Sequence, residues 1–381
     1  YDATNGRHYV VMDDSGSPRG EFRIMKSSAT PTVGQGWTQA DASAVTGANA
    51  DIYEVNVWHD ETNRKLLITA TIDPSGGGIE LLYWQFDIAT DSFDVEEQTI
   101  DAPAAGIDSD FHDICQADDG LIVVVHASDD RQKVYYQTRA NTTPATTWGT
   151  LTEAMTTTAA QFSARRCTRG ESGRVHIFGQ IPTGNLRHRT LTDAGTLGTE
   201  ATVTATGDMA TNVDVVYYDD NGSHRIHVPC LDDDFPDGPW ASMYTFASAD
   251  SPSVFTDEGY ALDNLDAGIV YDSFITRNQY RALIRDRTLV EVWIEETSYA
   301  LMVDWGSPKK YSMGTDQELM ASVAGRQFDG RLFVRSNQLW LGVVYAKAYS
   351  STATVGQNYA WVYTEFPIKG KPPKRGGGGG G

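Results

Sequence analysis

The chain has 381 residues, of which 51 are acidic and 30 are basic, so its formal charge near neutral pH is −21. Binding to nucleic acid is not expected, because the phosphate backbone requires a positively charged surface. No run of about 18 or more apolar residues occurs, so we expect no membrane-spanning helix. A hydrophobic fraction of 40% with 18 Tyr, 13 Phe and 9 Trp suits a globular protein rich in β-structure.

Strand-like segments recur in units of about 50 to 65 residues, a period typical of repeat architectures. Each unit has a strand, an acidic or Gly/Asn turn, a strongly apolar strand, an aromatic-rich strand and a Ser/Thr/Gly stretch. β-type repetition at this period predicts a β-propeller. The apolar strands that follow the turns are expected at 65–72, 121–127, 175–181, 225–231, 289–294 and 339–346.

In chain order, the first unit is incomplete. Strands are expected at 8–13 and 21–26, a third opens at 36–38, and no inner strand precedes His8. The count favours a single propeller of four-stranded antiparallel blades, seven in number, with six blades plus a closing strand as the alternative. The later units are expected over 53–100, 112–152, 164–203, 214–260, 280–313 and 331–366.

The last residues differ in composition from the rest of the chain. Residues 369–381 contain Lys371-Pro372-Pro373 and end in a run of glycines, which cannot form a core element. We therefore expect one propeller over residues 1–368 and a tail over 369–381. The tail is either disordered or an arm that docks on another subunit.

Two segments carry a family resemblance. Residues 128–139 run from Ser128-Asp129-Asp130 to Thr138-Arg139 and lead to Thr147-Trp148-Gly149, and Asp13-Asp14-Ser15-Gly16 leads through residues 22–28 to Gly36-Trp37-Thr38. These segments resemble degenerate Asp-box (BNR) repeats of sialidase-like propellers. Asp boxes are structural turns in that family, so the resemblance implies a fold and does not locate a site. No intact Ser/Thr-x-Asp-x-Gly-x-Thr-Trp motif occurs.

Candidate catalytic residues lie on the expected inner strands and their connecting loops, the usual ligand mouth of a propeller. Carboxylates beside arginines suit glycoside hydrolysis, and a histidine with Tyr and Arg could abstract a proton from a uronic acid. The alternative is that the same groups form structural ion pairs. The candidates are Asp110, His112, Arg165, Arg166, Asp272 and Arg277.

Other residues are candidates for ligand or metal contacts. Trp240 and Trp305 are the tryptophans closest to loops, and with Arg326 they are candidate contacts for a ligand or partner. The densest acidic loop could supply several oxygens to Ca²⁺, although its spacing is not that of an EF-hand. A solvated loop is the alternative, and no other cofactor is expected. The acidic residues of this loop are Asp232, Asp233, Asp234 and Asp237.

Two classes of function remain open. The first is a non-catalytic propeller that binds a glycan or protein on a surface or particle. A virion component, such as a phage tail or capsid-decorating receptor-binding protein, is one form of it, with an extracellular or virion-surface location. The second is a sialidase-like glycoside hydrolase or polysaccharide lyase with its site at the channel mouth. The lack of an intact motif favours binding.

Overall fold

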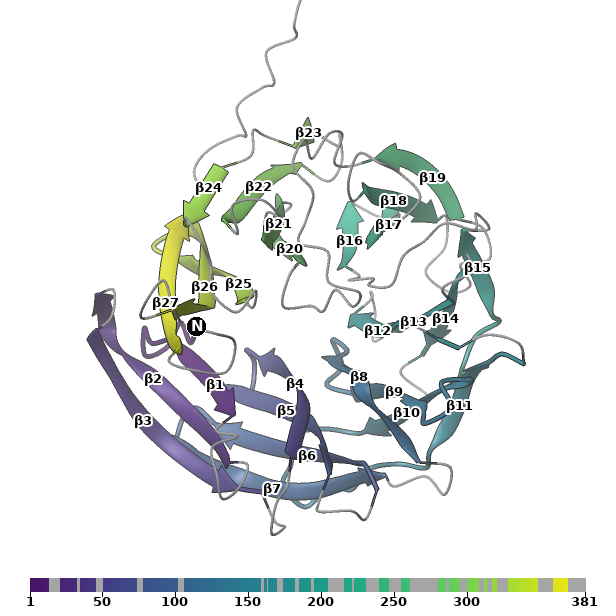
Figure 1. Cartoon of the computed structure of the whole chain (residues 1–381), viewed down its shortest axis with the longest axis horizontal. Coiled ribbons are helices and arrows are strands. Elements are labelled where there is room, and N and C mark those ends of the chain that lie inside the picture. Colours follow the sequence, from purple (N-terminus) through teal and green to yellow (C-terminus); the bar gives the residue numbers. More distant parts are fainter. Residues whose placement is uncertain are drawn as a thin grey trace, which may run out of the picture. The chain divides into compact units, whose positions relative to one another are not determined.

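The described part of the chain consists of β-strands. Every regular element is a strand, labelled β1 to β27 in Figure 1, so the expected all-β class is confirmed. Within the described ranges no helix is long and apolar enough to cross a membrane. The computed structural model describes residues 1–13, 21–32, 35–45, 51–73, 78–101, 106–158, 161–162, 164–169, 174–181, 185–192, 195–204, 216–220, 223–230, 240–246, 255–260, 280–285, 288–294, 300–307, 312–313, 317–320, 328–348 and 359–368, some strand positions by backbone alone.

The chain divides into two compact units, Tyr1–Gly207 with Ser248–Val254, and Asp208–Ala247 with Phe255–Gly381. The first unit contains four antiparallel sheets in chain order, and each is a simple up-and-down meander. Their strands are β1 (Tyr9–Asp13), β2 (Glu21–Thr32) and β3 (Gln35–Ala44); β4 (Asp51–Asp60), β5 (Lys65–Asp73), β6 (Glu80–Asp87) and β7 (Ser92–Asp101); β8 (Ile107–Gln116), β9 (Ile122–Ser128), β10 (Lys133–Arg139) and β11 (Thr152–Thr156); and β12 (Ala164–Arg169), β13 (Val175–Ile181), β14 (Asn185–Leu191) and β15 (Ala201–Thr204).

The second unit continues the same pattern with three further sheets among its described residues. In the middle sheet both β23 and β24 pair with β22. The strands are β16 (Val216–Asp220), β17 (Ser223–Cys230), β18 (Trp240–Phe246) and β19 (Phe255–Tyr260); β20 (Tyr280–Arg285), β21 (Thr288–Ile294), β22 (Leu301–Ser307), β23 (Ser312–Met313) and β24 (Gln317–Met320); and β25 (Phe328–Arg335), β26 (Gln338–Ala348) and β27 (Tyr359–Pro367).

Three of the second strands, β5, β9 and β13, are buried along almost their whole length because their sheets are covered on both faces. In β5, Ile68 belongs to a core shared with Phe22 and Ile24 of the first sheet. Its neighbour Leu67 belongs to a core shared with Val124 of the third sheet. Burying an aliphatic side chain of this size contributes about 1.5–3 kcal/mol relative to leaving it exposed. Loss of the period-two alternation therefore marks a strand packed between two sheets.

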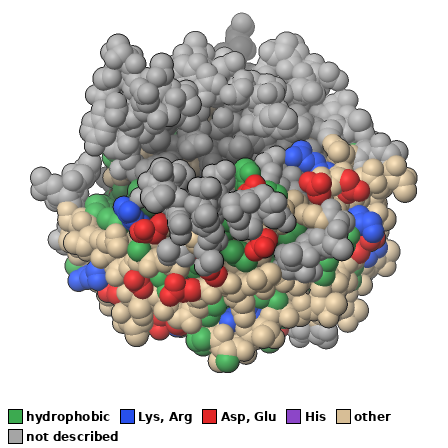
Figure 2. Space-filling model, turned by 60° about the horizontal axis from the view of Figure 1, so that its bottom comes forward, with side chains coloured by type: hydrophobic (Ala, Val, Ile, Leu, Met, Phe, Trp, Pro, Cys, Tyr) green, Lys and Arg blue, Asp and Glu red, His purple; other side chains and the backbone are tan. Residues whose placement is uncertain are grey.

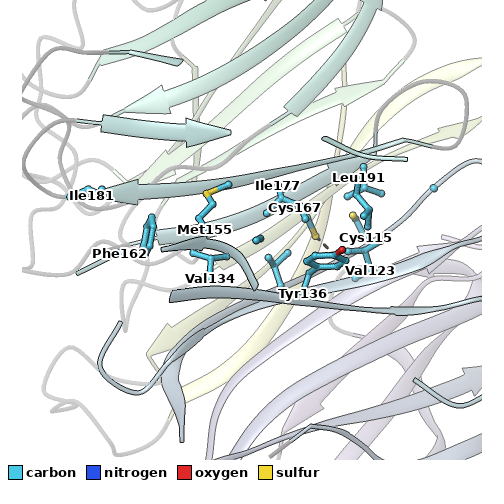
Figure 3. Packing of buried hydrophobic residues seen from close by; sticks show 14 residues of the cluster. Cys115, Val123, Val134, Tyr136, Met155, Phe162, Cys167, Ile177, Ile181 and Leu191 are labelled. Carbon is cyan, nitrogen blue, oxygen red and sulfur yellow. Dashed lines mark hydrogen bonds between the residues drawn. The ribbon is translucent and has the colours of Figure 1, made fainter. Parts of the chain in front are cut away.

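The third and fourth sheets of the first unit share another apolar core, drawn in Figure 3. Cys115 and Cys167 lie in it as buried thiols that form no disulfide, and they pack there as small hydrophobic residues. The side chain of Cys230 lies outside the described residues. Gly179 is closely approached by Phe162 and Met155, and a Cβ built there would lie 2.9 Å from the Phe162 ring.

In the second unit, the sheets β20–β24 and β25–β27 pack against one another through residues such as Val292, Val303 and Leu341. Ile368 also joins this core, and its amide donates to the Leu339 carbonyl. Residues 369–381 lie outside the described residues, so the division into a propeller and a tail stays a prediction. On the face shown in Figure 2, charged side chains of both signs are interspersed among the described residues.

The first strands of consecutive sheets are neighbours. In the first unit β4 contacts β8 and β8 contacts β12, and in the second unit β16 contacts β20 and β20 contacts β25. Successive antiparallel sheets stacked in this way are consistent with propeller blades, while the number of blades stays a prediction. The first sheet has three strands, β1 to β3, whereas each of the next three sheets has four, which agrees with the expected incomplete first unit.

Candidate functional site

Charged and polar side chains gather on the first strands of three consecutive sheets of the first unit. Glu54 lies on β4, His112 on β8 and Arg166 on β12. His112 has no exposed surface and Arg166 is 1% exposed, whereas the side chain of Glu54 is 20% exposed. Two of the expected catalytic candidates, His112 and Arg166, thus share one cluster with a carboxylate.

Side chains of β4 hold both backbone groups of His112. The His112 amide donates to Glu54 Oε2 at 2.9 Å, and Asn56 Nδ2 donates to the His112 carbonyl at 3.0 Å. As the first strand of its sheet, β8 pairs with β9 on one side only. Its outward N–H and C=O groups would otherwise lack partners, and leaving such groups buried and unpaired is costly. Glu54 and Asn56 complete the edge.

The next pair of first strands, β8 and β12, is joined by the same kind of hydrogen bond. The Cys167 amide on β12 donates at 3.0 Å to Oδ2 of Asp113, which is 2% exposed on β8. The other carboxylate oxygen of Asp113 accepts the Ile114 amide at 2.9 Å. A carboxylate on one first strand therefore accepts a backbone N–H of the next first strand, twice in succession.

The imidazole of His112 is enclosed by the protein. Its Nε2 lies 3.0 Å from Thr69 Oγ1 of β5, and its Nδ1 lies 3.4 Å from the same Glu54 oxygen that binds the amide. Burial acts to raise the pKa of Glu54. The hydrogen bond and charge of His112 and the charge of Arg166 outweigh burial, so the pKa of Glu54 lies below its ordinary value. Glu54 is therefore an ionised acceptor at neutral pH.

A β-bulge lies beside this cluster. The pairing of β4 with β5 shifts register between Ile52 and Glu54, so Tyr53 is the extra residue of the bulge. Among the described residues, Tyr53 is the one large hydrophobic side chain that is exposed, at 48%. A bulge re-aims a side chain without breaking the strand. Here it leaves an aromatic ring exposed next to an ionised carboxylate.

The remaining sequence candidates fall into two groups. Trp305 on β22 is buried in the core of the second unit, 7% exposed, a place that suits packing better than contact with a ligand. Asp110, Arg165 and Trp240 lie on β8, β12 and β18, but their side chains are outside the described residues. Also outside are Asp272, Arg277, Arg326 and the proposed Ca²⁺ ligands Asp232, Asp233, Asp234 and Asp237. Within the described ranges no group of three or more His, Cys, Asp or Glu side chains could hold a metal ion.

Sequence reasoning singled out neither Tyr53, Asn56 nor Thr69. A signal for the bulge is present in the sequence, because Ile52 and Val55 both pack against the core shared with the first sheet. A spacing of three between core residues breaks the period of two expected in a strand. The contacts of Asn56 and Thr69 join different sheets, and no local pattern encodes them.

The turn that carries the Asp-box resemblance is held by its own side chains. Ser128 Oγ donates to Asp130 Oδ1 at 2.5 Å, and the same oxygen accepts the Gln132 amide at 3.0 Å. The hydroxyl of Ser128 also accepts the Lys133 amide at 3.1 Å, and Arg131 has a positive φ of 57°. These bonds, first the one from Ser128, lower the pKa of Asp130. The turn joins β9 to β10 and is structural.

The sequence matches no family model and no curated protein. Among solved structures, the chain is similar to a protein of unknown function from Dyadobacter fermentans at 10% identity, over 85% of this chain and 96% of the other, with a TM-score of 0.54. It is also similar to AofleA from Arthrobotrys oligospora at 10% identity, over 84% and 91%, with a TM-score of 0.52. Similarity at such low identity shows a shared fold alone. The sialidase-like character therefore stays a resemblance of sequence.

Proposed function

We propose that this chain is a non-catalytic binding module of the β-propeller type, with a glycan or a protein as its partner. The proposal rests on one observation, which is that charged side chains of the first strands are hydrogen-bonded to backbone groups of the neighbouring first strand. Glu54 and Asp113 each accept the amide of the next first strand. The two oxygens that bind these amides, Glu54 Oε2 and Asp113 Oδ2, are not available for proton transfer.

Two further features support binding over catalysis. A general base must reach the proton that it removes, and His112 has no exposed surface. A glycosidase needs a carboxylic acid whose pKa is raised. Among the described residues, the carboxyl groups with a shifted pKa, namely Asp2, Glu54, Asp87 and Asp130, are all shifted downwards. The hydrolase or lyase alternative now depends on Asp110, Arg165, Asp272 and Arg277.

The proposed setting is an extracellular or virion surface, where the net charge of −21 keeps the protein soluble. The segment from Lys369 onwards is proposed to dock on another subunit. Its Pro-Pro and Gly-rich composition suits an extended arm that becomes ordered on binding. Deleting residues 369–381 should leave the folded body unchanged and abolish assembly with that subunit.

The decisive experiment incubates the purified protein with neutral and acidic glycans and follows bound and released sugars by mass spectrometry. Binding without cleavage is the expected result for a glycan partner. Cleaved products that disappear in the Asp110→Ala or Arg277→Ala variant would overturn the proposal in favour of an enzyme. If the protein neither binds nor cleaves any of the glycans, the search turns to a protein partner.

A further inference from the structure

We infer that Tyr53 and Glu54 form a contact site for a neutral sugar unit. The inference rests on the proposed binding function and specifies the class of partner. Its structural basis is the bulge in β4, which brings an exposed aromatic ring and a partly exposed carboxylate together.

The two side chains share one face of the strand. Ile52, Val55 and Val57 all pack against the core on one side of β4. In a regular strand, residues 52 and 55 would point to opposite faces. The extra residue restores the alternation, so both Tyr53 and Glu54 point away from that core. Glu54 accordingly contacts His112 of β8, which lies on the other side.

Glu54 retains capacity to bind a ligand. Its Oε2 accepts the His112 amide, while no hydrogen bond joins Oε1 to any residue in the described ranges. The side chain of Glu54 is 20% exposed, and in the inferred site Oε1, which binds no backbone amide among the described residues, accepts hydroxyl groups of the ligand. The lowered pKa keeps the carboxylate ionised, and hydrogen bonds to an ionised acceptor are about twice as strong as neutral ones.

An aromatic face beside a carboxylate matches the chemistry of a pyranose. The C–H face of the sugar offers an apolar surface that covers the Tyr53 ring, and aromatic rings are effective contact surfaces because they bury a large area. Neighbouring hydroxyls of the sugar then donate to Glu54 Oε1. One apolar platform with few directed polar groups is the usual composition of a small-molecule site.

Charge selects among sugars. A uronic or sialic acid carboxylate would meet the ionised Glu54, and like charges brought together at a binding site cost several kcal/mol. The net charge of −21 adds a long-range repulsion for anionic glycans. Arg166 is 1% exposed and its charge already acts on Glu54, so it offers little compensation. The geometry therefore points to neutral glycans, contrary to what a sialidase-like resemblance would suggest.

The test measures binding of short neutral oligosaccharides (xylose, mannose, galactose and glucose series) and of galacturonic and mannuronic acid oligomers by calorimetry. We expect binding of at least one neutral series and about tenfold or more weaker binding after Tyr53→Ala. Tyr53→Phe retains the ring and should stay within a few-fold, while Glu54→Gln should weaken binding about tenfold. Tyr135→Ala, on a third strand, is the matched control and should bind normally.

The possible results separate the two proposals. Neutral binding that Tyr53→Ala leaves unchanged overturns this site but leaves the proposed binding function in place. Preference for the acidic oligomers overturns the inferred class of ligand. Cleavage of any oligomer overturns the proposed function itself, whatever the Tyr53 variants do. Because Tyr53 is exposed, an unchanged melting temperature should accompany the loss of binding.

Discussion

Replacing Asp113 by alanine tests whether the first strands are joined by carboxylates. The substitution removes the acceptor of the Cys167 amide at 3.0 Å and of the Ile114 amide at 2.9 Å. A hydrogen bond to a charged acceptor contributes about 1.5–3 kcal/mol, and an unpaired buried donor costs about 1–3 kcal/mol. These contributions overlap, so we expect the free energy of unfolding to fall by about 2–4 kcal/mol, a large part of a typical total of about 5–15 kcal/mol.

The assay is urea denaturation at neutral pH followed by tryptophan fluorescence, together with hydrogen exchange of the peptide that covers β12. Exchange of the Cys167 amide should accelerate, because it loses its acceptor. Asp119→Ala is the matched control, since Asp119 also accepts a backbone amide, that of Leu121, but on an exposed turn. Equal destabilisation by the two variants within about 0.5 kcal/mol, with unchanged exchange at Cys167, would refute the reasoning.

Three further outcomes are expected. The pKa of Glu54 is lowered on folding, so its contribution to stability is present above about pH 4.3 and is lost as the pH falls below that value. The free energy of unfolding, measured by denaturation at a series of acidic pH values, should therefore fall less steeply with pH in Glu54→Gln. Arg139 is fully buried and donates to the carbonyls of Asn141 and Thr143, so Arg139→Ala should destabilise the protein by about 2–4 kcal/mol and expose residues 140–146 to limited proteolysis. The buried thiols of Cys115 and Cys167 should react with a thiol reagent only after unfolding, as peptide mapping would show.

The apolar strands were the most predictable part of the fold. The segment expected at 175–181 is β13 without change, and the one expected at 121–127 is β9 displaced by one residue. Continuous burial on both faces produces a run of hydrophobic residues that the sequence displays directly. The paired sheets and their chain order follow from this pattern.

Outer and inner strands were less predictable, for identifiable reasons. The third unit was expected to end at residue 152, but its fourth strand, β11, begins at Thr152. Trp148 instead packs from an irregular segment against Tyr83, with ring centroids 5.3 Å apart. The local sequence around an aromatic residue that packs against a sheet does not show whether that residue lies in a loop or in a strand. β8 begins at Ile107, earlier than expected, because Asp108 and Asp110 made its start appear polar.

The candidate site was predictable by residue type and not by geometry. His112 and Arg166, chosen as candidates because they lie on inner strands, both lower the pKa of Glu54, while their expected catalytic role stays a prediction. The roles of Glu54 and Asp113 depend on which backbone amides remain without a partner after sheet formation. That information exists only once neighbouring sheets are in place.

Among the described residues of the first unit, the side-chain-to-backbone joins between first strands run in one direction along the chain. Glu54 and Asn56 reach forward to His112, and Asp113 reaches forward to Cys167. During synthesis from the N-terminus, the second and third sheets therefore present hydrogen-bonding side chains before the strand that needs them has emerged. Each new sheet would then dock on a neighbour whose side chains can already bind its backbone groups. Folding during synthesis would therefore avoid a stage at which unpaired strand edges can bind other molecules. A permuted chain that begins at β8 would lose this order and should refold more slowly and aggregate more readily.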